Sequence, residues 1–191
     1  MEVIEAINKR RAVRDYVDRP VERSTVERLI HAAVQAPSAM NLQPWAFAVV
    51  LSRDRVHGYG SRAKSWLLAN FEQTPLGRSS EGPRLRQILE DKERLLFYNA
   101  RALVIILARS PDAQSAEDCC LAAENLMLAA RAEGIGSCWI GLSRPWLDLA
   151  TTKRELGIPE SHSVVAPILL GYPKEWPEPH GRNPAEIHWL G

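Results

Sequence analysis

One apolar run decides how this chain folds: Ala102-Leu103-Val104-Ile105-Ile106-Leu107-Ala108. Its β-branched centre and short length predict a strand. Because the run has no polar face, both of its faces have to be covered, and we therefore expect it at the centre of a sheet.

Two other apolar runs predict strands. Residues 45–51 are rich in β-forming side chains and predict a buried strand. Residues 164–170 predict another, and Pro167 indicates that this strand lies at an edge or carries a bulge, because proline has no N–H to give to a neighbouring strand. A short strand and turn are expected over residues 136–142.

The longest predicted helix covers residues 116–133 and is apolar around most of its circumference, with Leu121 and Leu126 among its apolar residues. Such a helix has to be buried, either in the core or against another subunit. Asn125 is its polar exception and is expected to have a structural role, since a buried amide needs hydrogen-bond partners. Gly134 is placed to end the helix.

Apolar periodicity, capping residues and prolines predict the structure of the remaining segments. A helix capped by Ser24 or Thr25 is expected to run to about Gln35. Residues 172–191 contain several prolines and are expected to run extended over the chain's own surface or a neighbouring subunit. Periodic apolar residues predict the other helices over residues 2–9, 53–71, 84–97 and 145–156.

Composition limits the class of protein. The chain has 191 residues, of which 46% are hydrophobic and 25% charged, which fits a single soluble domain over residues 1–191. A net charge of +1 gives no reason to expect a nucleic acid or an acidic membrane as partner. Three cysteines without a paired pattern suit a reducing cytosol, and scattered histidines argue against a zinc site. We see neither an export signal nor a membrane-spanning run, so we expect a cytoplasmic protein.

A polar turn between two prolines is a first candidate binding element. Pro37 and Pro44 restrict the backbone around Ser38, Asn41 and Gln43, so the turn can hold their donors and acceptors still. One hydroxyl and two amides suit the edge of a planar heterocycle that carries carbonyls and ring nitrogens. The alternative is a polar loop that closes on itself through its Asn and Ser side chains.

Arginines near the start of the chain form a second candidate. Arg10, Arg11 and Arg14 gather three guanidinium groups within five residues, and the planar donors of arginine match a phosphate group. The alternative is a solvated basic surface, because exposed basic side chains are the norm. Downstream, the glycines of residues 134–142 would let the backbone come close to a flat ligand.

Together the stretches 4–16, 37–45 and 134–142, with the tail 167–189, resemble the nitroreductase superfamily of FMN-dependent oxidoreductases. The resemblance covers nearly the whole chain. It implies an α+β fold in three α-β-α layers, with a central mixed, mostly antiparallel sheet and a C-terminal tail that extends over the partner subunit. It also implies a homodimer with its flavin sites at the interface, and it makes residues 72–86 a possible mobile substrate loop, for which a plain surface connection is the alternative.

The resemblance further implies how the enzyme would work. NADH or NADPH would pass a hydride to flavin N5, and a nitroaromatic, quinone or similar acceptor would then take the electrons in ping-pong chemistry. No side chain is required as an acid or base. The residues implied for FMN are Arg10, Arg11, Ala12, Arg14, Pro37, Ser38, Asn41, Gln43, Trp139, Ile140, Gly141, Leu142 and Arg182.

This chain departs from the family pattern at two of these positions. Ala12 stands where a serine is common, which removes one hydroxyl donor from the phosphate site. Gly141 stands where larger relatives carry an acidic residue. Two alternatives stay open: the same fold with another flavin reaction, such as dehalogenation, heterocycle oxidation or flavin cleavage, and a non-catalytic flavin-binding protein.

Overall fold

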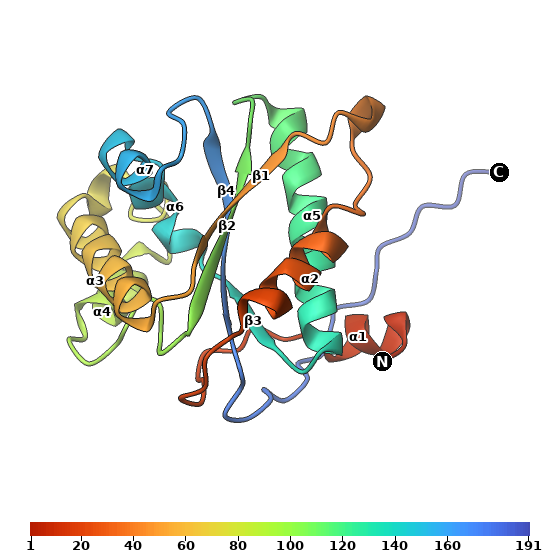
Figure 1. Cartoon of the computed structure of the whole chain (residues 1–191), viewed down its shortest axis with the longest axis horizontal. Helices are drawn as coiled ribbons and strands as arrows, with labels where there is room; N and C mark the ends of the chain where they lie inside the picture. Colours follow the sequence, from red (N-terminus) through yellow and green to blue (C-terminus); the bar gives the residue numbers. More distant parts are fainter.

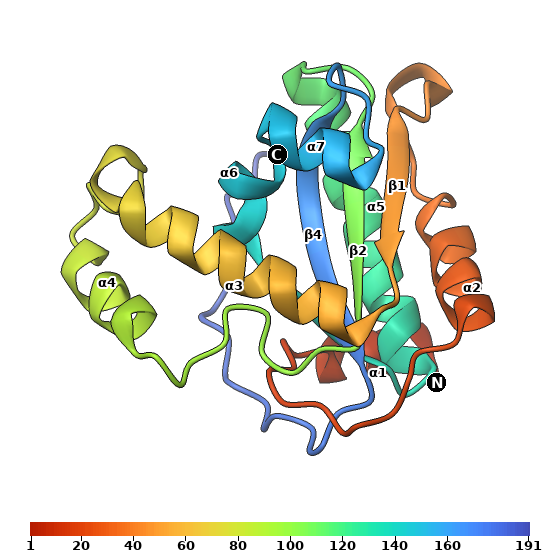
Figure 2. The same cartoon turned by 60° about the vertical axis from the view of Figure 1, so that its left-hand side comes forward.

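The computed structural model describes residues 1–191, in which a four-stranded sheet lies between two layers of helices. Figures 1 and 2 show α1, α2 and α5 on one face of the sheet and α3, α4, α6 and α7 on the other. The expected three-layer α+β fold is therefore confirmed. The helices are α1 (Val3–Lys9), α2 (Arg23–Ala33), α3 (Arg53–Ala69), α4 (Gly82–Glu90), α5 (Ala113–Ala132), α6 (Arg144–Leu147) and α7 (Ala150–Leu156).

The sheet has the strand order β1-β2-β4-β3, and each neighbouring pair is antiparallel. Its strands are β1 (Trp45–Val50), β2 (Ala102–Ala108), β3 (Gly136–Trp139) and β4 (Ser163–Gly171). A parallel pairing is found outside these strands, as an isolated bridge between Ala12 and Ser137. The mixed character expected of the sheet is thus confined to this bridge.

Strand β2 is central, as its sequence predicts. All seven of its residues are buried. Leu103, Ile105 and Leu107 join the core under α3, whereas Val104 and Ile106 join the core under α2 and α5. This alternation follows from the two-residue period of a strand, and it explains why the run needs no polar position.

Strand β4 corrects one expectation and confirms the other. Pro167 does not lie at an edge, because β4 runs between β2 and β3. The pairing with β2 shifts nearby: Ile106 pairs with Ala166 but Leu107 with Val164, which leaves an extra residue in β4. This irregularity is the alternative that the proline indicated.

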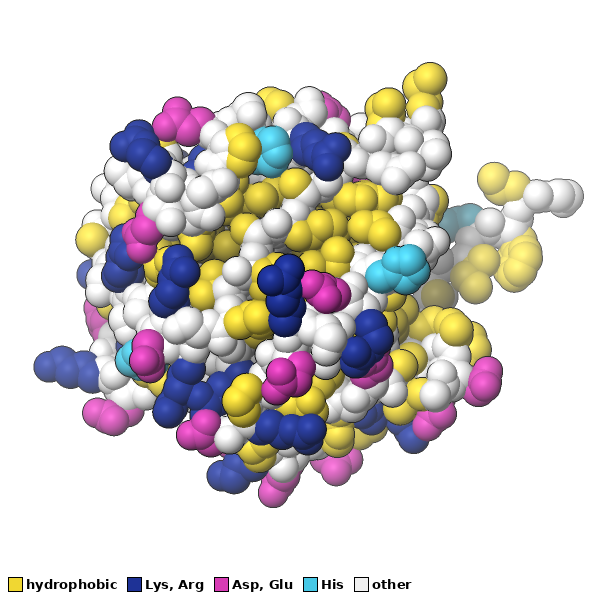
Figure 3. Space-filling view, viewed as in Figure 1, with side chains coloured by type: hydrophobic (Ala, Val, Ile, Leu, Met, Phe, Trp, Pro, Cys, Tyr) yellow, Lys and Arg dark blue, Asp and Glu magenta, His cyan; other side chains and the backbone are white.

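Strand β1 lies at one edge of the sheet and is less buried than its sequence predicts. Trp45 and Val50 are buried, but the residues between them are not, and Val49 is 40% exposed. Figure 3 shows apolar side chains gathered on the surface where β1 lies in front in Figure 1. Composition alone could not reveal that only one side of this strand has a partner.

Three helix predictions need correction. Ser24 and Thr25 do not cap α2, which begins at Arg23 after Glu22 without a side-chain cap. The helix expected to reach residue 97 ends at Glu90. Leu96 and Phe97 are buried, but they belong to an irregular segment after the helix. The helix expected over residues 145–156 is split into α6 and α7 at Leu149, whose backbone is extended (φ −62°, ψ 138°).

Other boundaries agree with the sequence. Helix α5 has 20 residues and is followed by Gly134 at φ 75°, where a side chain would be strained. Asn125 donates to Ala32 O at 3.4 Å, which ties α5 to α2 as a structural amide should.

Within residues 72–86, Thr74 is buried and its hydroxyl donates to Phe71 O at 2.7 Å. No helix is both long and apolar enough to cross a membrane.

We expect the substitution Ile105→Ala to lower the free energy of unfolding by about 2–5 kcal/mol, because it empties a fully buried position between the layers. Urea denaturation at fixed protein concentration measures this loss. The control Leu76→Ala removes a side chain that is 43% exposed and should change stability by less than about 0.5 kcal/mol. Equal losses for the two variants would contradict a core centred on β2.

Candidate functional site

The arginine segment 10–14 is held against the sheet by its backbone. Val13 N donates to Ser137 O at 2.9 Å, and Ala12 forms the parallel bridge to the same residue. The Val13 side chain is buried against Gly136, where an added Cβ would lie 2.9 Å from it. The segment therefore has a fixed place beside β3.

The three arginines of this segment differ in their partners. Arg10 pairs with Glu124 of α5 at 3.3 Å. Arg11 donates to two backbone carbonyls, those of Asn8 and Arg10, and its buried Nε has no hydrogen-bond partner. Arg14 is exposed and has no carboxylate partner. The guanidinium groups of Arg11 and Arg14 thus have no carboxylate partner. Arg11 Nε is a buried donor that a bound anion would satisfy.

A cavity of about 250 Å³ is lined by both Arg14 and Leu142. The structure therefore brings the predicted stretches 10–14 and 139–142 together. Its walls are mostly apolar, and it is lined by three cationic side chains and no carboxylate. The lining residues are Arg14, Lys64, Leu85, Ile88, Leu89, Arg94, Leu95, Leu96, Tyr98 and Leu142.

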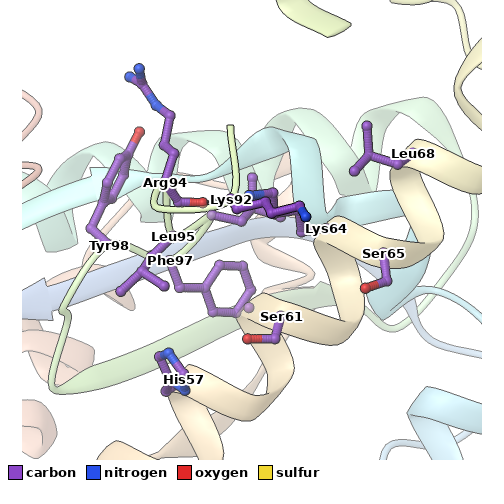
Figure 4. Close-up of a pocket in the computed structure, with 12 residues that line it drawn as sticks. His57, Ser61, Lys64, Ser65, Leu68, Lys92, Arg94, Leu95, Phe97 and Tyr98 are labelled. Atoms are coloured by element: carbon purple, nitrogen blue, oxygen red, sulfur yellow. Dashed lines mark hydrogen bonds between the residues drawn. The ribbon is translucent and has the colours of Figure 1, made fainter. Parts of the chain in front are cut away.

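A second cavity of about 250 Å³ adjoins the first and shares Lys64, Arg94 and Tyr98 with it. Figure 4 shows the Arg94 guanidinium and the Tyr98 hydroxyl extending in the same direction, away from Ser61 and His57 of α3. The Lys64 ammonium donates to the carbonyls of Asp91 and Arg94 at 2.6 and 2.7 Å, which fixes the segment after α4.

Sequence reasoning missed Lys64, Arg94 and Tyr98 as site residues. Tyr98 has φ 53°, an uncommon conformation for a tyrosine, and no sequence pattern marks it. The predicted helix over residues 84–97 also hid Arg94, because a helical residue there would have been assigned to a solvated face. Only the observed end of α4 exposes this segment as the wall of a cavity.

The predicted ring-binding stretch 139–142 follows β3 at its end. Ile140 is buried and its N–H donates to Pro167 O at 2.9 Å. A Cβ added to Gly141 would meet nothing closer than the Trp139 indole nitrogen at 4.0 Å. The backbone at Gly141 therefore borders open space, as a surface for a flat ligand requires.

The polar turn closes on itself through its own side chains. Gln43 N donates to Ser38 Oγ, and Gln43 Nε2 donates to Asn41 Oδ1, both at 3.0 Å. Met40, Asn41 and Gln43 have φ values of 50°, 56° and 49°, in the region that favours glycine. Strain of this kind persists where the surroundings enforce it and is common at functional sites. Each of the three polar side chains keeps unused hydrogen-bonding groups.

The turn and the arginine segment lie at opposite ends of the sheet in one chain, as Figure 1 shows. Pro44 O accepts from Arg109 N beyond one end of β2. Val104 of β2 pairs with Ile168 of β4, which in turn pairs with Trp139 of β3. Trp139 therefore lies two strands away from β2, at the height of Val104. At about 3.4 Å per residue along a strand and 4.8 Å between strands, roughly 20 Å separates the polar turn from the arginine segment beside β3.

The last predicted ligand, Arg182, is also remote from the others. Its guanidinium donates only to the carbonyls of His180 and Gly181. Every residue from Glu178 to the end of the chain is exposed, and Figure 1 shows this tail leaving the body of the protein beyond α1. A single chain therefore assembles only the 10–14 and 139–142 parts of the predicted site.

The sequence profile of the Nitroreductase family matches residues 7–172. The chain belongs to the nitroreductase family. Among curated nitroreductase relatives, a protein of Archaeoglobus fulgidus provisionally named NADH dehydrogenase/NAD(P)H nitroreductase is 33% identical, over 98% of this chain and 97% of its own. The 4-nitrobenzoate reductase of Nocardioides sp. is 27% identical, over 90% of this chain and 81% of its own.

A solved nitroreductase with bound FMN, from Bacteroides fragilis, matches this chain with a TM-score of 0.81 and 26% identity over 100% of both chains. An iodotyrosine deiodinase structure shares the fold, with a TM-score of 0.76 and 21% identity over 100% of both chains. The fold itself is therefore shared by proteins named for different reactions.

Cysteine chemistry is not favoured in this protein. Burial raises the pKa of the Cys119 thiol to about 12 and also raises the pKa of Cys138, which lies in β3 close to the arginine segment. A thiol with a raised pKa stays protonated near neutral pH and is a poor nucleophile.

We expect a disulfide reagent at pH 8 to modify the exposed Cys120 first and to leave Cys119 and Cys138 intact in the folded protein. The pKa of all three thiols is raised, so the order of reaction follows from burial, which keeps the reagent away from Cys119 and Cys138. Absorbance of the released thiolate measures the number of reacted groups, and guanidinium-unfolded protein, with all three thiols accessible, is the control. Rapid modification of folded Cys138 would overturn the expectation.

Proposed function

We propose that this nitroreductase, an NAD(P)H-dependent flavoprotein oxidoreductase that uses FMN, passes electrons to a nitroaromatic, quinone or similar acceptor by ping-pong chemistry. The observation that carries the proposal is the acid-free cavity between Arg14 and Leu142, beside guanidinium groups that have no carboxylate partner. FMN in a solved relative that is 26% identical, and the nitroaromatic named in 4-nitrobenzoate reductase, support it.

The residues of the arginine segment fit the FMN phosphate. Arg11 Nε is a buried donor without an acceptor, and leaving such a donor unpaired costs about 1–3 kcal/mol. A phosphate oxygen would satisfy it, while the exposed Arg14 could turn toward the same dianion. Ala12 offers no hydroxyl, so its backbone N–H is the donor left at that position.

The cavity residues fit the edge of the flavin ring. Bound FMN would supply the hydride chemistry, taking electrons from NAD(P)H and giving them to the acceptor. The chain's part is to hold Arg94 close to the ring edge on which negative charge develops. Leucine and isoleucine side chains line the rest of the cavity and exclude water, which strengthens that electrostatic stabilisation.

We further propose that the enzyme is a homodimer and that each flavin site takes residues from both subunits. Ser38, Asn41 and Gln43 would come to the arginine segment from the partner, since one chain holds them roughly 20 Å away. Arg182 would reach the phosphate from residues 178–191, which are all exposed in one chain. Exposed apolar side chains on α1, on the polar turn and on α5 give a second copy surface to cover: Val3, Ile4, Ile7, Met40, Leu42 and Leu121.

The proposal names a class of electron acceptor and not one physiological substrate. A 5,6-dimethylbenzimidazole synthase of Rhodospirillum rubrum is 28% identical over 87% of this chain, so close sequence similarity alone does not choose the reaction. Three unpaired cysteines suit a reducing cytoplasm as the place of action.

The function is tested with purified protein, an absorption spectrum and anaerobic titration with NADH and with NADPH. We expect a yellow protein whose visible absorption bleaches with one of the two nucleotides and recovers when 4-nitrobenzoate or a quinone is added. Free FMN at the same concentration is the control for uncatalysed reduction. Bound flavin that bleaches no faster than free FMN would leave only the flavin-binding protein, and colourless protein that takes up no FMN would overturn the proposal.

The shared site is tested by mixing two damaged subunits. Arg11→Ala and Asn41→Ala homodimers should each bind FMN about 10-fold more weakly, because each loses hydrogen bonds to a charged or polar group of the ligand. In a heterodimer of the two variants, one site carries both changes and the other carries neither. Fluorescence titration should then recover one site of wild-type affinity per dimer.

The mixed dimer has a matched control in Arg23→Ala, which removes an exposed guanidinium of α2 that pairs only with Glu27. This change should leave FMN affinity unaltered in either dimer. A heterodimer with two weakened sites would mean that each chain binds flavin alone.

A further inference from the structure

Asp118 is a buried carboxylate that holds the polar turn from the side of α5. Its side chain is 3% exposed. Both of its oxygens accept from Ala39 N, at 3.3 and 3.2 Å, and Oδ1 also accepts from Gln114 Nε2 at 3.2 Å. No arginine or lysine pairs with it. A buried carboxylate with only neutral donors is uncommon and costly, so its position calls for a reason.

The turn depends on this contact for its attachment. Its remaining hydrogen bonds within residues 38–43 are local, and Pro44 O is the next atom held by the body of the protein, through Arg109 N. Ala39 begins the short 3₁₀ turn Ala39–Asn41, and the left-handed residues Met40 and Asn41 follow it directly. A strained backbone of this kind relaxes unless something fixes it.

We propose that Asp118 is a positioning residue for flavin binding. It fixes the Ala39 amide and thereby sets the orientation in which Ser38, Asn41 and Gln43 face the flavin of the partner subunit. This role rests on the proposed function, because it assumes that the turn binds FMN. Asp118 acts through the Ala39 N–H and does not touch the ligand.

The experiment compares Asp118→Ala with Asp118→Asn in the full-length protein. The alanine removes the acceptor, whereas the asparagine keeps an oxygen for the Ala39 N–H and removes only the charge. Hydrogen exchange of the Ala39 amide is the first readout, and it needs no flavin. We expect exchange to be at least about 10-fold faster in the alanine variant and close to wild type in the asparagine variant.

FMN affinity is the second readout. We expect the dissociation constant to rise about 10-fold in Asp118→Ala and less than about 3-fold in Asp118→Asn. The matched control is Asp112→Ala, which removes the cap at the start of the same helix, where Asp112 accepts from Ser115 N at 2.8 Å. This control weakens α5 without touching the turn, so Ala39 exchange and FMN affinity should stay at wild-type values.

A second variant keeps the test decisive if Asp118→Ala does not fold. Ala39→Pro removes the donor and leaves the carboxylate in place, and the extended Ser38 at φ −141° and ψ 152° accepts a following proline. FMN affinity should fall about 10-fold, as expected for the loss of one charge-assisted hydrogen bond. An Ala39→Pro variant with wild-type FMN affinity would overturn the positioning role.

The outcomes separate this inference from the proposed function. Wild-type protein that binds no FMN would overturn the proposed function and the positioning role with it. Wild-type protein that binds FMN, together with an Asp118→Ala variant of unchanged affinity, would overturn the positioning role alone. Unchanged exchange at Ala39 would do the same, and so would an equal loss of affinity in the Asp112→Ala control.

Discussion

The burial of β2 on both faces is the constraint on which the rest of the structure depends. Every side chain of the strand is apolar, so each face of the sheet has to be covered by helices. The chain meets this demand with two separate clusters, one packed on α3 and the other on α2 and α5. The polar segments are thereby displaced to the ends of the sheet, where strands and helices connect.

That displacement separates the binding elements of one chain. The arginine segment and the loop after β3 meet around an acid-free cavity at one end, whereas the strained polar turn lies at the other. If both elements bind FMN, as we propose, one chain holds two halves of a site that cannot meet within that chain. In the homodimer that we propose, two copies related by a twofold axis would make two complete sites from four halves, and the exposed apolar residues near each half offer surface for that contact.

The sequence allowed the architecture to be predicted wherever a single segment carried its own signal. The apolar run of β2, the periodicity of α5 and the glycine after it were all interpreted correctly. Predictions failed where the outcome depended on distant neighbours. Pro167 could not indicate that β3 would pair outside it, and residues 45–51 could not indicate that one of their sides would be bare. Arg94 was missed for a related reason, because α4 ends where tertiary packing of Leu96 and Phe97 takes over from helical propensity.

The unpaired Nε of Arg11 has a consequence for the life of the protein in the cell. A chain without a bound anion carries the cost of a desolvated donor, and the FMN phosphate that we propose there would remove that cost. Anything that supplies an acceptor there raises the fraction of folded molecules by mass action. The supply of the vitamin-derived cofactor would therefore set how much of this polypeptide survives proteolysis, in addition to how much of it turns over substrate.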